Sequence, residues 1–145
     1  MFRGRSNHTL DSKGRLAIPV RFKEILEQKS EDCLVVTNHY SCLWGYARED
    51  WRRLEEKVAG LSQFDNSGII FFRYFISGAE VCFIKNGRIT IPQNLREVAG
   101  LKKEVVLIGG LKKFEIWDRE KWAVEFDRVS ENFREASQAL PDLTI

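Results

Sequence analysis

The sequence has few of the residues that cross-link small proteins or bind metals. Its 145 residues include three cysteines, three prolines and two histidines. Cys33, Cys42 and Cys82 are odd in number and have no C-x-x-C spacing, which argues against a disulfide framework and a zinc site. We expect all three to be reduced and buried. His8 and His39 have no second ligand at a metal-binding spacing, so we interpret them as structural or surface residues.

Long hydrophobic runs and catalytic motifs are absent as well. The longest apolar stretch, GIIFFRYFISGA, is interrupted by Arg73 and is about half the roughly 20 residues that a membrane span needs. The opening MFRGRSNHTL lacks the apolar core of a signal peptide, so we expect a cytoplasmic protein with no membrane partner. No G-x-S-x-G, G-x-G-x-x-G, P-loop or H-E-x-x-H motif occurs. We therefore predict no enzyme activity, cofactor or small-molecule substrate.

Charge is distributed unevenly along the chain. The formal net charge is +2, but residues 1–25 and 85–103 each carry a net +4, whereas residues 115–142 carry a net −4. Two separated basic segments suggest a polyanionic partner such as nucleic acid. Local charge excesses on an ordinary solvated surface are the alternative interpretation.

Both basic segments contain nearly the same nonapeptide. DSKGRLAIP occupies residues 11–19 and IKNGRITIP occupies residues 84–92, with the Gly-Arg pairs 73 residues apart. Residues 33–51 then match residues 104–122 at an offset of 71, which indicates a duplicated unit of about 45 residues. Such a unit is too small to bury a core alone. We predict an α+β fold, mainly β, in which two units pair into one pseudo-twofold β-barrel with flanking helices.

The local pattern is the same in both units. A short strand leads into a turn at Gly14 or Gly87, where glycine can supply a positive φ, and a second strand follows. Pro19 or Pro92 then takes the first position of a short helix, and the second of these helices can end at a glycine cap, Gly100. A hairpin comes next, with Gly109-Gly110 at the turn of the second copy.

The connecting segment SQFDNSGIIFFRYFISGAE is ambiguous. Its aromatic and β-branched residues favour a strand, whereas Asn66 or Ser67 as an N-cap and Gly78 as a terminator favour a helix. We predict a helix here.

Arg15 and Arg88 are the principal candidate binding residues. Each directly follows the turn glycine, and an arginine on a protruding turn can pair with guanine O6 and N7 in the DNA major groove. Lys13 and Lys85 lie in the same turns and could contact phosphates. Solvated turn residues without a partner are the alternative.

Asp11 precedes Arg15 by four residues and could orient its guanidinium through a bidentate pair, or it could simply cap the turn. The second copy has Ile84 four residues before Arg88, so we expect no such orientation there. Two arginines near the N-terminus could form a flexible arm on phosphate or a solvated terminus: Arg3 and Arg5.

Taken together, MFRGRSNHTLDSKGRLAIPVRFKEIL, GRITIPQNLREVAGL and VVLIGGLKKFEIWDREKW closely resemble the MraZ family, within the SpoVT/AbrB-like group of bacterial transcription factors. The resemblance covers nearly the whole chain. It implies SpoVT/AbrB-like repeats at 5–50 and 77–121, a helical connection at 51–76, and a C-terminal helix and tail at 122–145. It also implies that swapped hairpins from the two repeats form one barrel.

The resemblance further implies a function. MraZ-like proteins assemble into rings and bind direct repeats in double-stranded DNA upstream of the division and cell-wall gene cluster, including their own promoter, which they mostly repress. The family's Asp-x-x-x-Arg motif carries over as Asp11 and Arg15, and in the second repeat only as Arg88. We therefore expect a nucleoid-associated, homo-oligomeric regulator. An oligomeric protein-interaction scaffold of the AbrB-like antitoxin type is the alternative, with the acidic residues 115–142 as its recruiting surface.

Overall fold

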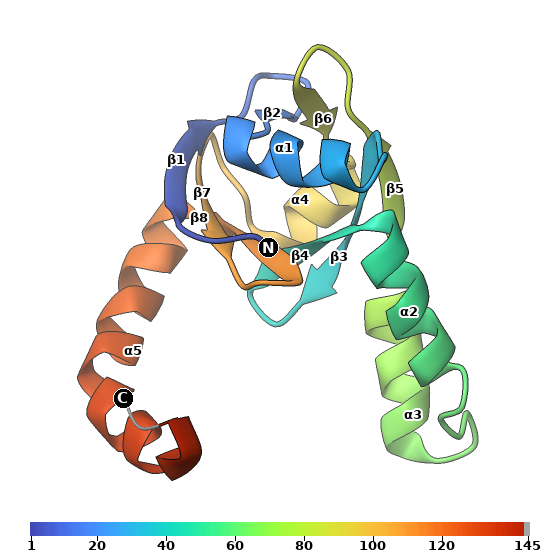
Figure 1. Ribbon diagram of the computed structural model, residues 1–145, viewed down its shortest axis with the longest axis vertical. Coiled ribbons are helices and arrows are strands. Elements are labelled where there is room, and N and C mark those ends of the chain that lie inside the picture. The colour runs from blue at the N-terminus through green and yellow to red at the C-terminus, as the bar shows by residue number, and fades with distance from the viewer. Residues whose placement is uncertain (144–145) are drawn as a thin grey trace.

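A computed structural model describes residues 1–143, over which the chain forms eight strands and five α-helices with two short helical turns (Figure 1). The strands are β1 (Arg5–Thr9), β2 (Arg15–Ala17), β3 (Cys33–His39), β4 (Cys42–Ala47), β5 (Glu80–Phe83), β6 (Arg88–Thr90), β7 (Glu104–Gly109) and β8 (Lys113–Asp118). The helices are α1 (Val20–Gln28), α2 (Arg48–Val58), α3 (Asn66–Phe71), the π-helix η1 (Phe72–Ile76), α4 (Gln93–Ala99), α5 (Arg119–Gln138) and the 3₁₀-helix η2 (Pro141–Leu143). The end of the expected tail, residues 144–145, lies outside the described residues.

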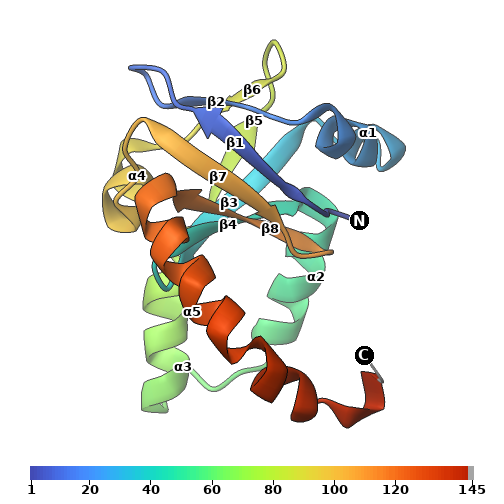
Figure 2. The ribbon, with the colours of Figure 1, turned by 90° about the vertical axis from the view of Figure 1, so that its left-hand side faces the viewer.

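The strands of the two predicted repeats are interleaved. A six-stranded antiparallel sheet has the order β1-β7-β8-β4-β3-β5, and a separate ribbon pairs β2 with β6 (Figure 2). Four pairings join strands of the first repeat to strands of the second: β1–β7, β5–β3, β4–β8 and β2–β6. Exchanging the repeats maps this set onto itself, so the connectivity has an approximate twofold symmetry.

The fold is α+β with mainly antiparallel strands, but no closed barrel is found among the described residues. The reason lies in the ribbon strands β2 and β6, which have three residues each and pair fully only with each other. In the described part of the chain, backbone hydrogen bonds link each ribbon strand to the preceding strand of the sheet only within the turn that joins them. In the first turn this is the bond from Asp11 N to Arg15 O at 3.3 Å. The ribbon therefore covers the sheet as a second layer and does not close it.

The turn and cap residues behave largely as the local pattern predicts. Gly14 and Gly87 have φ values of 78° and 73°, and Gly100 ends α4 in the left-handed region. Pro19 and Pro92 differ slightly from the prediction, because each occupies the N-cap with φ −55° and not the first helical position. The difference is one residue, within the usual uncertainty of a helix boundary.

The loop between β7 and β8 differs in backbone conformation from the predicted glycine turn. Leu111, and neither glycine, has the positive φ, at 72°. Gly109 is needed for a close approach, since a Cβ there would lie 2.4 Å from the backbone of Arg3. Phe2 exchanges two 2.8 Å backbone hydrogen bonds with Leu111, and its side chain is buried. The N-terminal segment is thus held against the sheet, which argues against the flexible-arm alternative for Arg3 and Arg5.

The connecting segment is helical, as predicted, and consists of α3 and η1. Its N-cap is Asp65, whose side chain accepts from the Gly68 N–H at 3.0 Å, and not one of the two residues predicted after it. Gly78 does not have a positive φ. Its lack of a side chain instead makes room for Asn38, whose Nδ2 would lie 2.4 Å from a Cβ.

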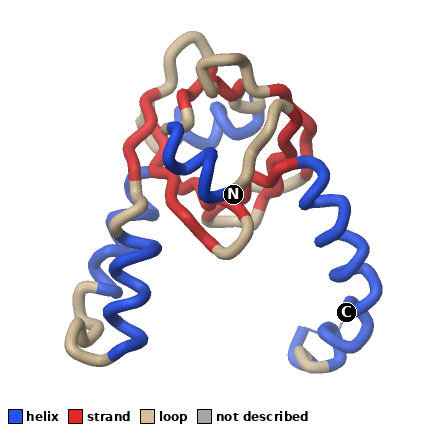
Figure 3. The backbone as a smooth tube through the Cα atoms, turned by 180° about the vertical axis from the view of Figure 1, so that it is seen from behind, coloured by secondary structure: helices blue, strands red, loops and turns tan. Residues whose placement is uncertain are grey.

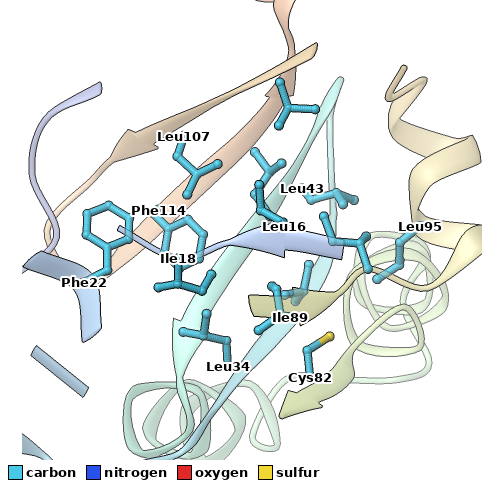
Figure 4. Close-up of a cluster of buried hydrophobic side chains, with 14 of the residues drawn as sticks. Leu16, Ile18, Phe22, Leu34, Leu43, Cys82, Ile89, Leu95, Leu107 and Phe114 are labelled. Carbon is cyan, nitrogen blue, oxygen red and sulfur yellow. The ribbon is translucent and has the colours of Figure 1, made fainter. Parts of the chain in front are cut away.

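The main hydrophobic core lies between the inner face of the six-stranded sheet, the β2–β6 ribbon, α1 and α4 (Figure 4). Residues from both repeats contribute to it, among them Leu16, Phe22, Leu34, Leu43, Ile89, Leu95, Leu107 and Phe114. A second cluster on the outer face packs Val35 and Tyr46 against Trp51 of α2 and Phe75 of η1. The α2–α3 pair and α5 project as two separate legs, and the ribbon turns lie at the opposite end (Figures 1 and 3).

Candidate nucleic-acid interface

The β2–β6 ribbon brings the two predicted arginines onto one outward face. Its register pairs Leu16 with Ile89, whose side chains are buried in the core. Side chains alternate between the faces of a strand, so the preceding residues Arg15 and Arg88 face away from the core. In an antiparallel pair these two positions are diagonal neighbours, which long side chains can span.

The Asp11 carboxylate organises the first turn. Its Oδ1 accepts hydrogen bonds from the backbone N–H groups of Lys13 and Arg15, both at 2.9 Å. Its Oδ2 accepts from Arg15 Nε at 2.5 Å. The residue therefore caps the turn and contacts the guanidinium at the same time, but through one bond to Nε and not through the predicted bidentate pair.

The same carboxylate reaches the second arginine. Arg88 Nη1 lies 3.8 Å from Asp11 Oδ2, across the ribbon. The expectation that Arg88 lacks a carboxylate holds only within its own turn, because antiparallel pairing supplies one from the other repeat. One acidic side chain thus lies between two arginines whose side chains remain 41% and 43% exposed.

The structure also shows why Ile84 does not match Asp11. Lys85 N donates to Arg88 O at 2.8 Å, as Asp11 N does to Arg15 O, so Lys85 occupies the place of Asp11. The second turn is therefore one residue shorter, and Ile84 lies before it, packed against the core. An equal spacing in the sequence conceals this difference in turn length.

The electrostatics of the site keep Asp11 ionised. The hydrogen bond from the Arg15 backbone N–H is the largest cause that lowers the pKa of Asp11, and the Arg15 side chain and the Lys13 N–H add to it. Together they lower the pKa of Asp11 to about 2. The carboxylate is consequently charged, and able to contact both arginines as an anion, throughout the neutral pH range.

Reciprocal backbone bonds tie the two turns into one unit. Ile91 N donates to Gly14 O at 2.9 Å, and Ile18 N donates to Gly87 O at the same distance. Each turn glycine is therefore bonded to the strand end of the other repeat. This cross-bracing fixes the spacing between the two arginines.

Each turn is also covered by a basic side chain that the sequence analysis did not select. A Cβ on Gly14 would lie 2.6 Å from Arg96 Cζ, and a Cβ on Gly87 would lie 2.6 Å from Lys23 Nζ. Arg96 is held in place by the bond from its Nε to Ile91 O at 3.0 Å. The 73-residue offset matches Lys23 with Arg96 and was the available signal.

The remaining candidates divide by position. Lys13 and Lys85 are exposed in the two turns, beside the arginines. Arg5 begins β1, six residues before Asp11, which at about 3.3 Å per strand residue is roughly 20 Å away. Its guanidinium lies over the Phe126 ring at 4.7 Å. The structure therefore does not bring Arg5, or Arg3 before it, to the paired turns.

Neither a metal-ligand cluster nor a membrane-spanning helix is found among residues 1–143. That part of the chain contains no cluster of three or more His, Cys, Asp or Glu side chains able to hold a metal ion. None of its helices has the length and apolar character to cross a membrane. The three cysteines are free and buried, as expected, and His39 stacks on Trp44 with ring centroids 3.6 Å apart.

The fold and the site define the class of protein. It is a small protein with an internal repeat, whose two halves are interleaved and present a pair of basic turns bonded to each other. Residues 1–68 and 75–143 match the family model described as "MraZ protein, putative antitoxin-like". The chain is 41% identical to the transcriptional regulator MraZ of Halothermothrix orenii over the full length of both chains. It is 48% identical to that of Syntrophobacter fumaroxidans, over 83% of this chain and 81% of the relative. The chain belongs to the MraZ family.

Proposed function

We propose that this protein is a sequence-specific, DNA-binding transcription regulator that reads base edges with Arg15 and Arg88. The observation that carries the proposal is the Asp11 carboxylate, which contacts both guanidinium groups on the outward face of the ribbon. An oriented guanidinium pairs bidentately with guanine in the major groove. Two such groups at a fixed spacing are suited to reading two nearby bases.

The turns contain a second kind of contact. Lys13 and Lys85 are exposed beside the arginines, where flexible ammonium groups suit phosphates more than bases. Gly14 and Gly87 adopt the positive φ that lets the turns protrude. In this proposal the lysines contribute affinity and the arginines contribute sequence preference.

The proposed target follows from the family. The relatives are named transcriptional regulators, and the family resemblance points to direct repeats upstream of the division and cell-wall gene cluster. We infer that the protein represses this cluster, including its own promoter, as a cytoplasmic, nucleoid-associated factor. We also interpret the interleaved strands of 5–50 and 77–121 as swapped-hairpin repeats of the SpoVT/AbrB-like type.

A homo-oligomeric ring is part of the same proposal, and α5 supports it. This 20-residue helix has no buried residue. Its apolar residues recur at alternating steps of four and three, which is the spacing of a helix-packing seam. They are Trp122, Phe126, Val129 and Phe133.

The internal symmetry indicates what could cover this seam. Trp51 and Val58 of α2 correspond to Trp122 and Val129 at the 71-residue offset. Both are buried, and Trp51 packs against Phe75 of η1. Helix α5 has no such partner within the described residues of its own chain. The α3–η1 segment exposes Ile70 and Tyr74 on the other leg (Figure 1). A contact between α5 of one copy and α3–η1 of the next is head-to-tail, and such contacts form a ring when the rotation between copies closes.

The ring is tested by the molecular mass in solution. Phe133→Glu places a charge on the seam and is expected to lower the mass measured by light scattering after gel filtration. Gln138→Glu adds the same charge to an exposed position on the opposite face of α5 and should leave the mass unchanged. Equal masses for both variants and the wild type would argue against the α5 contact.

DNA binding is tested by fluorescence anisotropy with DNA from upstream of the protein's own gene and a scrambled duplex. Arg15→Ala should lose more affinity for the upstream DNA than for the scrambled DNA. Lys13→Ala should weaken both by similar factors. Equal losses on both duplexes for Arg15→Ala would show that this arginine contacts only phosphate.

The exposed seam on α5 also favours a second candidate function, an oligomeric scaffold that holds a protein partner. Purification of the tagged protein from its host with nuclease treatment separates the two. A stoichiometric protein partner that survives the nuclease, together with equal binding to both duplexes, would favour the scaffold.

A further inference from the structure

A basic pocket lies on one side of the first turn. Two adjoining cavities of about 480 and 580 Å³ separate this turn from the loop between α4 and β7. Both are lined by Ser12 of the turn, Arg96 of α4 and Lys102 of the loop, and Lys103 lines the first. We name these four residues the first-turn cradle.

The cradle is built on fixed supports. Arg96 is anchored by its Nε bond to Ile91 O, and its Nη atoms have no hydrogen-bond partner within the described part of the chain. The loop backbone is held by Asp118, which is buried and accepts from Lys102 N at 3.2 Å. Lys103 O accepts from Leu10 N at 2.7 Å, which joins the loop to the start of the turn. The cationic side chains are therefore displayed from a rigid frame.

The acids near the cradle are already engaged. Asp11 lines the first cavity but is paired with Arg15 and Arg88. Glu97 lines the second and accepts a hydrogen bond from Gln93 at 2.9 Å. Lys102 pairs with Glu120, but both side chains are largely exposed, and such surface pairs are weak and exchangeable. The pocket is thus available to an anion.

The second turn has no equivalent pocket chemistry. Ile84 N donates to Asp32 O at 2.9 Å, the counterpart of the bond from Leu10 N to Lys103 O. Asp32 therefore stands where the other repeat has Lys103, and Glu31 stands where it has Lys102. Glu31 accepts a hydrogen bond from Glu49 N at the start of α2, and Asp32 is exposed. Lys23 covers Gly87 as Arg96 covers Gly14, so the two sides of the ribbon differ in their loop residues, which are two lysines on one side and two acids on the other.

We propose that the first-turn cradle binds a backbone phosphate of double-stranded DNA, and that the acids beside the second turn repel the backbone on the other side. The inference rests on the proposed function, because it assigns an orientation to DNA that the paired turns already contact. Each protomer would then engage its DNA box in one direction only. In the proposed head-to-tail ring, whose protomers all face the same way, such one-directional binding suits direct repeats and not palindromes.

The test is the salt dependence of binding by the full-length protein, measured by anisotropy with the upstream duplex. Lys102→Gln combined with Lys103→Gln should make the slope of log affinity against log salt less steep by about 1 to 2, at about 0.9 per phosphate contact. The matched control is Lys57→Gln combined with Lys112→Gln, two exposed lysines on α2 and the β7–β8 loop. It removes the same charge and should leave the slope unchanged.

Hydroxyl-radical footprinting supplies the directional readout. The wild type should protect the backbone more strongly on one flank of each box, and the Lys102/Lys103 variant should lose that protection. Asp32→Lys should add protection on the opposite flank. If the cradle and control variants have equal salt slopes while Arg15→Ala still abolishes the preference for the upstream duplex, the cradle proposal fails and the proposed function stands. Absence of any wild-type binding to either duplex would overturn the proposed function together with it.

Discussion

Replacement of Asp11 by asparagine separates the two roles of this residue. An asparagine Oδ1 can still accept the hydrogen bonds from the N–H groups of Lys13 and Arg15, so the turn should keep its shape. The substitution removes the negative charge that orients Arg15 at 2.5 Å and Arg88 at 3.8 Å. We expect Asp11→Asn to reduce the sequence preference of both arginines while the protein remains folded.

The size of the effect follows from the arginine contacts. A bidentate arginine–guanine pair discriminates by about 1–3 kcal/mol, which is about 5- to 150-fold in affinity. If Asp11 orients both guanidinium groups, each arginine loses part of its discrimination in Asp11→Asn. The two losses multiply in the preference for the upstream duplex over the scrambled duplex. Binding to the scrambled duplex should change little or rise slightly, because a negative charge is removed near phosphate.

The assay is a double-mutant cycle on the ratio of the two dissociation constants. Arg15→Lys and Arg88→Lys keep the charge but lose the guanidinium fork. Each is measured alone and combined with Asp11→Asn, and each should cost less preference in the asparagine background. Asp127→Asn, on the exposed face of α5, removes the same charge far from the turns and serves as the control.

Arg88 provides the decisive comparison. If Arg88→Lys costs the same preference with and without Asp11, the contact across the ribbon does not orient Arg88, and the shared-carboxylate argument fails. If Asp127→Asn reduces the preference as much as Asp11→Asn, the loss is caused by the change in net charge and not by the contacts of Asp11 with the arginines.

Further predictions concern stability and reactivity. Gly45→Ala should lower the free energy of unfolding in urea by about 1–3 kcal/mol, because its Cβ would lie 2.4 Å from the Phe114 ring, whereas Gly60→Ala meets no atom closer than 3.7 Å and should cost nothing. Similar losses for both would contradict this. The lowered pKa of Asp11 means that its ionised form stabilises the fold. Its contribution should be complete above about pH 4 and lost as the pH falls to about 2, so the stabilities of wild type and Asp11→Asn should converge over that interval. Burial raises the pKa of the Cys42 thiol to about 12, so this thiol should resist alkylation at pH 8 until the protein unfolds, which mass spectrometry can follow.

Features that depend on neighbouring residues were predictable from the sequence. The positive φ at Gly14 and Gly87, the strands beside them and the helical connection all follow from local chemistry. The exception among local features is the N-terminal segment. Arg3 and Arg5 left a flexible arm and a solvated terminus equally open, but the side chain of Phe2 beside them packs against Phe22 and Phe114 in the core.

Features that depend on strand pairing between the repeats were not predictable. The contact between Asp11 and Arg88 joins residues 77 positions apart and exists only in the register that pairs Leu16 with Ile89. The shorter second turn was not predictable because Ile84 precedes Arg88 by four residues, just as Asp11 precedes Arg15. Closure of the barrel was predicted wrongly because β2 and β6 pair with each other and not with the strands of the six-stranded sheet, which the pattern of the repeats does not reveal.

The interleaving explains how a duplicated motif can lose half of its carboxylates. In separate domains, the repeat with Lys85 in place of Asp11 would hold an arginine without an acidic partner. Here the antiparallel ribbon places both arginines around the one remaining carboxylate, and the bonds from Ile91 to Gly14 and from Ile18 to Gly87 keep them there. The pseudo-twofold frame thus preserves the geometry of the two arginines while leaving the second turn free to change its charge. The two sides of the ribbon have diverged in this way, with lysines beside one turn and acids beside the other.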